Sequence, residues 1–520
     1  MPQRDVFSQV QVDVTTGAVP DGGAPADDTP FHIAIVGNFG GRSGEPSAGS
    51  GALLLSDRRP HRVDRDDLDS VLALIAPRLT LDLGGDEPVV VSFASLDDFH
   101  PDSLHARLPM FAALRELRQQ LSDPRTFASA AAGLRSTTAA GRQAAAEPHP
   151  SAASTADRLA GGSLLDEIVA AAPDSATHTG SSATGHPTTG SGGELATFLQ
   201  RVVAPHLVAD ADPRQQELLA SVDAASTALL RLILAHPRVR SLEALWRGLD
   251  LLVRRVETDS SLRLAIIDAS SSELAGALAN ESGDVRDGAV YRMLHDGTRT
   301  LPGAAPWSLL VGLDPIGVGS TSAAEVALLD GLARVAAALG APWVTAAPTA
   351  IARPEAGQSP PAGWETLRRS PQGRWLGLAF PSLLLRLPYG KEGDECDALP
   401  GFEELEPGRE LSSRMEELCW GSPALVPALV LSAAFTSGGW AMRPADHVQV
   451  DRLPLYLHRA AGSVVAVPPT RRLLDDDEIM RLLAAGVMPL VATREGDAAR
   501  LASLQSVAEP STTLSGRWRA

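Results

Sequence analysis

The stretch LLLRLPYGKEGDECD, at residues 383–397, combines an apolar run with a dense acidic group and a thiol. Four carboxylates, Glu392, Asp394, Glu395 and Asp397, surround Cys396. Paired carboxylates can act as a general acid and base, and a cysteine thiolate can act as a nucleophile. No histidine lies within 50 residues of Cys396, so the local sequence lacks the base that activates a cysteine. Two interpretations stay open here: an active-site loop, or a structural turn followed by a solvated acidic loop.

A glycine-rich segment, VGNFGGRSGEP, follows the apolar run FHIAIV at residues 31–36. A loop that follows a strand is where dinucleotides and phosphates bind in many α/β proteins. The glycines stand at positions 37, 40, 41 and 44, which does not match G-x-G-x-x-G, and no Gly-Lys-Ser or Gly-Lys-Thr follows. We therefore expect no cofactor at this loop.

The remaining reactive side chains form no recognisable catalytic or metal-binding motif. The 12 histidines and two cysteines contain no H-E-x-x-H or C-x-x-C pair, and no G-x-S-x-G elbow occurs. The acidic run LDDDE at 474–478 precedes IMRLLAAG, which is typical of a helix N-terminus rather than of a glycosidase acid pair. The sequence thus predicts no catalytic residue, no metal site and no enzyme.

Length and charge limit the class of protein. A chain of 520 residues is expected to form two to four domains, and its net charge of −18 argues against a partner that is a nucleic acid or an anionic membrane. Two cysteines cannot build a disulfide framework, which favours a reducing compartment. No signal-peptide core and no apolar run of membrane-spanning length is present, so we expect a cytoplasmic protein.

The elements that must position these residues fall into five regions. Residues 1–29 are predicted to be a flexible arm, in which VFSQVQVDV alternates enough to form a strand against a partner. Residues 30–125 alternate strands and helices, as an α/β unit does. Residues 196–510 contain long amphipathic helices and a strand, helix, strand order between 307 and 347 that predicts a parallel sheet. Residues 511–520 form a C-terminal tail.

Residues 126–195 join these parts and are rich in Ala, Ser, Thr and Gly, a composition typical of a flexible linker. One aliphatic island, GGSLLDEIVAAA at 161–172, interrupts this segment and predicts a short helix over 163–170. One face of that helix carries Leu164, Leu165, Ile168 and Val169. A helix this short is marginal in water, so it is expected to dock on another surface.

Several long motifs resemble one known family. FHIAIVGNFGGRSG, RPHRVDRDDLDSVLALIAPRLTLDL and LDDFHPDSLHARLPMFAALRELRQQLSDP resemble the small sheath subunit of bacterial type VI secretion systems. SLLDEIVAAA, HPRVRSLEALWRGLDLLVRR, WETLRRSPQGRWLGLAFPSLLLRLPYG, CWGSPALVPALVLSAAF and GWAMRPADHVQVDRLPLYL resemble the large sheath subunit, in the same order. Two subunits that are usually separate chains are thus expected here in one.

The resemblance implies a mixed α/β, contractile phage-tail-sheath-like fold with two or more α/β domains joined by the linker. It implies a structural subunit that polymerises around an inner tube protein on baseplate components and contracts to drive the tube into a target cell. Neighbouring subunits are tied by donated strands. Because large subunits continue beyond the matched region, the alternative is an accessory or adaptor that binds sheath subunits without forming a full tube.

The resemblance also assigns roles to two segments. The island helix is the family's handle for an AAA+ ATPase that disassembles contracted sheath, so Leu164, Leu165, Ile168 and Val169 are the expected partner-binding residues. Docking of this helix on its own sheath body is the equally weighted alternative. In the opening stretch, Leu383–Leu387 are expected to end a buried strand, Pro388-Tyr389-Gly390 to form the family's turn, and residues 391–397 to be solvated.

Overall fold

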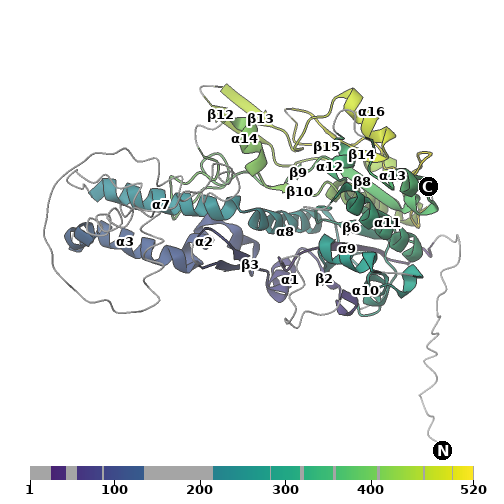
Figure 1. The fold of residues 1–520 in the computed structure, drawn as a ribbon, viewed down its shortest axis with the longest axis horizontal. Coiled ribbons are helices and arrows are strands. Elements are labelled where there is room, and N and C mark those ends of the chain that lie inside the picture. The colour runs from purple at the N-terminus through teal and green to yellow at the C-terminus, as the bar shows by residue number, and fades with distance from the viewer. Residues whose placement is uncertain are drawn as a thin grey trace, which may run out of the picture.

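The fold centres on one nine-stranded mixed sheet (Figure 1). The computed structural model describes residues 25–42, 55–84, 87–123, 125–133, 215–280, 283–301, 303–316, 321–354, 359–406, 410–460, 463–494 and 496–518. In spatial order, the strands are β11 (Gln449–Val450), β15 (Ala499–Leu501), β14 (Val487–Ala492), β8 (Leu376–Phe380), β7 (Trp343–Ala346), β6 (Leu309–Gly312), β1 (Phe31–Gly37), β5 (Leu262–Asp268) and β2 (His61–Val63). Residues 1–24 of the expected arm, residues 134–195 of the expected linker and the island helix lie outside the described residues, whereas residues 127–133, at the expected start of the linker, are helical.

Strand β1 lies inside this sheet, although it comes from the first part of the chain. It pairs in parallel with β5 along seven residues and with β6 along four, and every one of its residues is buried. The sequence FHIAIVG explains this position, because a strand that is apolar on both faces needs neighbours on both edges and cover on both sides. Strands β1 and β2, from the region 30–125, therefore share one sheet with strands from residues 196–510.

The predicted strand, helix, strand unit is present between β6 and β7. Helix α11 (Ser322–Leu339) joins these two parallel strands, as predicted. The Thr321 side chain accepts a hydrogen bond from the Ala324 amide at the helix start, and Gly340 ends the helix with φ of 65°. A left-handed residue in this position is the usual reason for a glycine there.

Side chains of alternate residues in β1 point into two separate cores. Phe31, Ile33 and Ile35 pack with α7 (Gln215–Ala235), α8 (Pro237–Arg255) and α15 (Leu425–Gly438). Ala34 and Val36 pack with α9 (Ser271–Ala279), α10 (Ala289–Thr298) and α11. The arrangement is a three-layer α/β/α fold in which one interior strand of the sheet, β1, belongs to the N-terminal region.

A group of helices extends away from the sheet, and α7, which precedes α8 in the chain, forms part of it (Figure 1). There α3 (Ala112–Ser122) lies beside α7, and the Arg118 guanidinium donates to the Asp223 carboxylate at 2.6 Å. Helix α7 is the one described helix that is long and apolar enough to cross a bilayer. Eight of its side chains are buried against the rest of the protein, so core packing accounts for its apolar character.

Shorter elements complete the described chain. Two-stranded antiparallel sheets are formed by β3 (Arg78–Leu81) with β4 (Val89–Ser92), β9 (Leu383–Leu384) with β10 (Trp420–Gly421), and β12 (Tyr456–Ala460) with β13 (Ser463–Val467). The other helices are α1 (Leu68–Ile75), α2 (Pro101–Arg107), α12 (Thr349–Ala352), α13 (Trp364–Arg369), α14 (Leu411–Arg414) and α16 (Asp476–Ala484). In the region expected to be a C-terminal tail, Leu514 and Trp518 are buried in the first core, and the Trp518 ring lies 6.2 Å from that of Phe31.

Candidate functional site

The LPYG turn contains a buried ionic network instead of a catalytic group. Arg386 makes two paired contacts, donating to Glu243 at 2.6 and 2.9 Å and to Glu404 at 2.6 and 2.8 Å. Its guanidinium carbon also lies 3.8 Å from the centre of the Tyr389 ring. The run LLLRLPYG therefore contains an arginine whose hydrogen-bonding capacity is used inside the protein.

Helix α8 contributes the other side of this network. Glu243 is 1% exposed and accepts from Arg247, one helical turn on, at 2.8 Å and from the Tyr389 hydroxyl at 3.0 Å. Burial alone would raise the pKa of Glu243, but Arg386 and Arg247 outweigh it and lower that pKa to about 2. The carboxylate is thus held ionised as a structural anion and is a poor proton carrier near neutral pH.

The acidic loop that follows is solvated, as expected for its carboxylates. Glu392, Asp394, Glu395 and Asp397 are exposed, and the Asp394 side chain is 67% accessible. Cys396 is an exception to the expected exposure, because its side chain is buried, and burial raises its pKa to about 12. A thiol with that pKa is protonated near neutral pH and does not act as a nucleophile. These features favour the structural interpretation of the stretch over the active-site one.

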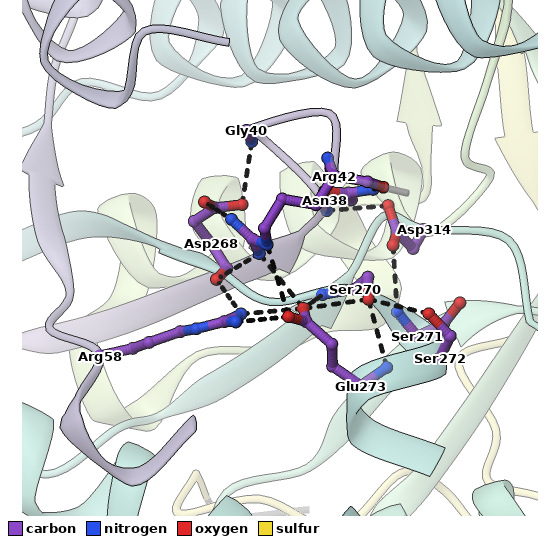
Figure 2. Close-up of polar contacts among 10 residues, drawn as sticks. All are labelled: Asn38, Gly40, Arg42, Arg58, Asp268, Ser270, Ser271, Ser272, Glu273 and Asp314. Atoms are coloured by element: carbon purple, nitrogen blue, oxygen red, sulfur yellow. Dashed lines mark hydrogen bonds and ion pairs between the residues drawn. The ribbon is translucent and has the colours of Figure 1, made fainter. Parts of the chain in front are cut away.

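A second polar group lies at the carboxyl ends of β1, β5 and β6, and we call it the junction cluster (Figure 2). Its members come from the glycine-rich loop, the segment before β2, the start of α9 and the end of β6. They are Asn38, Gly40, Arg42, Arg58, Asp268, Ser270, Ser271, Ser272, Glu273 and Asp314. In open α/β sheets, ligands bind at this edge.

Two arginines of the N-terminal region clamp two carboxylates of the later region. Arg42 pairs with Asp268 and donates to Glu273 at 3.2 Å. Arg58 donates to Glu273 at 2.9 Å and to the Asp268 carbonyl at 2.7 Å. Burial would raise the pKa of Glu273, but hydrogen bonds from Arg58, the Ser270 amide and Arg42 lower it well below its ordinary range.

The backbone of the glycine-rich loop is held by the same carboxylates. The Gly40 amide donates to Asp268 at 2.9 Å, and the Asn38 amide donates to Asp314 at 3.0 Å. Asp314 also accepts from the Ser271 amide at 3.1 Å. Burial raises the pKa of Asp314 to about 6, although these two amides oppose the shift. The loop donors that would face a phosphate are thus directed at protein carboxylates.

Sequence reasoning identified the glycine-rich loop but missed the clamp. Arg42 and Asp268 lie 226 residues apart, and Arg58 and Glu273 lie 215 apart, so no local pattern joins them. One local signal was readable: Ser270 and Glu273 form a capping box at the start of α9, with the S-x-x-E spacing. Within the described ranges, no group of three His, Cys, Asp or Glu side chains could hold a metal ion.

A crevice of about 750 Å³ lies beside the junction cluster, at the carboxyl ends of β6, β7 and β8. Helix α8 forms one wall and the segment 415–425 forms another. Apolar side chains line its interior, including Leu313, Phe380 and Trp420. The expected partner-binding residues, Leu164, Leu165, Ile168 and Val169, lie outside the described residues, so the structure does not place them.

Known proteins match the two parts of the chain separately. Residues 216–508, more than half of the chain, match the family model described as EvpB/VC_A0108, tail sheath N-terminal domain. Residues 9–139 match the model described as Type VI secretion system, VipA, VC_A0107 or Hcp2. Two Pseudomonas aeruginosa proteins are similar. The first, type VI secretion system sheath protein TssC1, is 30% identical over 320 residues, which is 58% of this chain and 63% of that protein.

The second relative is the type VI secretion system sheath protein TssB1 of the same organism. It is 26% identical over 104 residues, which is 19% of this chain and 58% of that protein. The chain therefore spans less than two thirds of the length of each relative. The two family models, at residues 9–139 and 216–508, cover the arginines and the carboxylates of the junction cluster, respectively.

Proposed function

Since this chain belongs to the sheath family of type VI secretion systems, with a small-subunit-like part fused to a large-subunit-like part, we propose that it polymerises into a contractile sheath. The tube would surround an inner tube protein, stand on baseplate components in the cytoplasm and contract to drive the inner tube into a target cell. No nucleotide is needed in the subunit, because the extended lattice itself would store the energy.

One observation carries the proposal: β1, from the part similar to one sheath subunit, is an interior strand of the sheet built mainly by the part similar to the other. Its seven pairs with β5 and four with β6 join the two parts through a shared sheet. The junction cluster adds charged contacts at the end of the same strand. A fused protomer of this kind would move as a unit when a sheath changes length.

The hairpin β12–β13 supports the assembly part of the proposal. Among the described residues, its two strands pair only with each other, and it lies at the edge of the molecule in Figure 1. Leu457 and Val464 stand on its outer face and are 44% and 58% exposed. Free strand edges beside exposed aliphatic side chains suit addition of a strand from a neighbouring subunit.

We further propose that Leu164, Leu165, Ile168 and Val169 bind an AAA+ disassembly ATPase. The support is the family membership and the aliphatic face of this island in an otherwise polar segment. Replacing Leu165 and Ile168 by Asp would abolish capture by such an ATPase while leaving assembly intact. Unchanged capture by the double variant would refute this assignment.

Electron microscopy of the purified full chain tests the main proposal. Tubes or cogwheel-like rings are expected, and a strictly monomeric particle at high concentration would contradict self-assembly. A pull-down with separate small and large sheath subunits then distinguishes the accessory role, which predicts binding to them without a tube of its own. Failure of both assays would remove the sheath function altogether.

A further inference from the structure

The crevice beside α8 has the composition of a binding groove for a short amphipathic segment. Leu245, Leu313, Ile316, Phe380 and Trp420 provide apolar walls. A crevice of about 750 Å³ with such walls falls in the size range of pockets that bind ligands or short segments. Its position at the carboxyl ends of three parallel strands is the usual ligand position in open α/β sheets.

Charged side chains also line the crevice. Three arginines line it, Arg353, Arg471 and Arg472, against two carboxylates, Glu325 and Glu416. The chain as a whole carries a net charge of −18. Arg471 pairs with Glu416 at the rim, and Arg472 pairs with a carboxylate of α16, whereas Arg353 is exposed. Arg353 is therefore the lining arginine that is left to pair with an acidic group of an occupant.

The aliphatic island of the chain has the matching chemistry. Residues 159–177 contain three acidic residues, Asp166, Glu167 and Asp174, and no Lys, Arg or His. At helical spacing, Leu164, Leu165, Ile168 and Val169 share one face while Asp166 and Glu167 lie beside it. An aliphatic face with an acidic border fits an apolar groove with an arginine rim.

The chain is long enough to bring the island to the crevice. Helices α7 and α8, with 21 and 19 residues, together span ~60 Å at ~1.5 Å per residue. The crevice contacts the middle of α8, at Ser241–Gly248, so it lies within that span of the start of α7. The 30 residues between Gly133 and Leu164 reach ~100 Å when extended, at ~3.3 Å per residue.

We propose that residues 163–169 of the same chain bind in this crevice, with the aliphatic face inward and Asp166 and Glu167 toward the arginine rim. A tethered segment has a high effective concentration, so even weak contacts keep it bound. Binding there would compete with capture of the same residues by another protein. The inference does not depend on sheath assembly, because it concerns a single chain.

Thiol cross-linking in the full chain tests the proposal. The chain's own thiols, Cys396 and Cys419, are buried and should not react with the cross-linker. Any cross-link then comes from the pair of introduced cysteines. We expect a short bismaleimide to join Ala171→Cys to Thr349→Cys, which lies on the crevice rim and is exposed. The matched control joins Ala171→Cys to Leu74→Cys, which is 66% exposed and lies outside the crevice. Equal yields for the two pairs would overturn the proposal.

Two substitutions sharpen the result. Ile168→Asp should reduce the yield of the rim pair to that of the control pair, because it places a charge on the buried face. Arg353→Glu should lower the yield about two- to fivefold, the effect of one exposed ion pair, and Arg299→Glu, an exposed arginine outside the crevice, should not. Circular dichroism confirms that each variant is folded.

Other occupants give other outcomes, and each would overturn the proposal. A cross-linked dimer whose yield rises with protein concentration would assign the crevice to a second copy of the chain. Preferential cross-linking from Phe198→Cys would assign it to the next apolar segment of the same chain. The cross-links within one chain are measured at low protein concentration, so they stand whether or not micrographs show tubes.

Discussion

The buried network around Arg386 makes Glu243 the residue whose neutralisation should destabilise the protein most clearly. We predict that Glu243→Gln lowers the free energy of unfolding of this region by about 3 to 5 kcal/mol, the usual cost of removing one partner of a buried ion pair. An independent route gives a similar value. A pKa lowered from 4.5 to about 2 corresponds to about 3 kcal/mol, at about 1.4 kcal/mol per pKa unit.

Thiol labelling of Cys419 offers a local readout of this loss. Cys419 is 2% exposed, and its carbonyl accepts from the Leu385 amide in the β9–β10 pair, next to Arg386. A loss of about 3 kcal/mol raises the open population, and with it the labelling rate at fixed pH, by about 100-fold. Glu257→Gln removes the same charge at an exposed position and serves as the control.

The pH dependence gives a second check with a fixed sign. Because the pKa of Glu243 is lower in the folded protein than in the unfolded chain, its contribution is complete above about pH 4.5 and is lost as the pH falls toward 2. The stability gap between wild type and Glu243→Gln should therefore narrow below about pH 4.5. A gap that is independent of pH, or no larger than that of Glu257→Gln, would refute the reasoning.

Three further predictions follow from other contacts. Arg58→Met should lower the midpoint of urea unfolding by an amount equivalent to about 1 to 3 kcal/mol, since Arg58 donates to two acceptors in the junction cluster, whereas Arg59→Met, at an exposed position, should have little effect; equal midpoints would contradict the clamp. Leu457→Asp should abolish assembly in micrographs with an unchanged monomer, and Met480→Asp, exposed on α16, should not; tubes formed by Leu457→Asp would exclude the hairpin. Cys396 should react with a maleimide at pH 8 about 1,000-fold more slowly than an ordinary thiol, since burial raises its pKa from 9.0 to about 12; fast labelling in mass spectra would refute its assignment as a buried, protonated thiol.

Local patterns were sufficient for most elements of the larger region. The strand, helix, strand unit around α11 followed from a helical period bounded by apolar runs and a terminal glycine, all of which lie within forty or so residues. The acidic run at 474–478 was correctly assigned to a helix start, since Asp475 and Glu478 form a capping box at α16. Such signals depend only on neighbours in the chain.

The placement of β1 could not be predicted in the same way. Its apolar sequence shows that it is buried on both faces, but its partners β5 and β6 are chosen by packing with residues more than two hundred positions away. The same limit applies to Arg42 and Arg58, which look like ordinary loop residues until Asp268 and Glu273 are placed beside them. The role of Arg386 could not be predicted either, because an arginine in an apolar run does not indicate which carboxylates it pairs with.

The position of β1 has a mechanical consequence. A pull on the chain before residue 31 would load this strand along its own axis, parallel to both neighbours. In that geometry the backbone hydrogen bonds to β5 and β6 bear the load together, in shear, instead of opening one after another as they do when a hairpin is peeled apart. The arm would thus be anchored through a strand that is hydrogen-bonded along both edges. The ion pairs of two arginines in the junction cluster hold the carboxyl end of that strand.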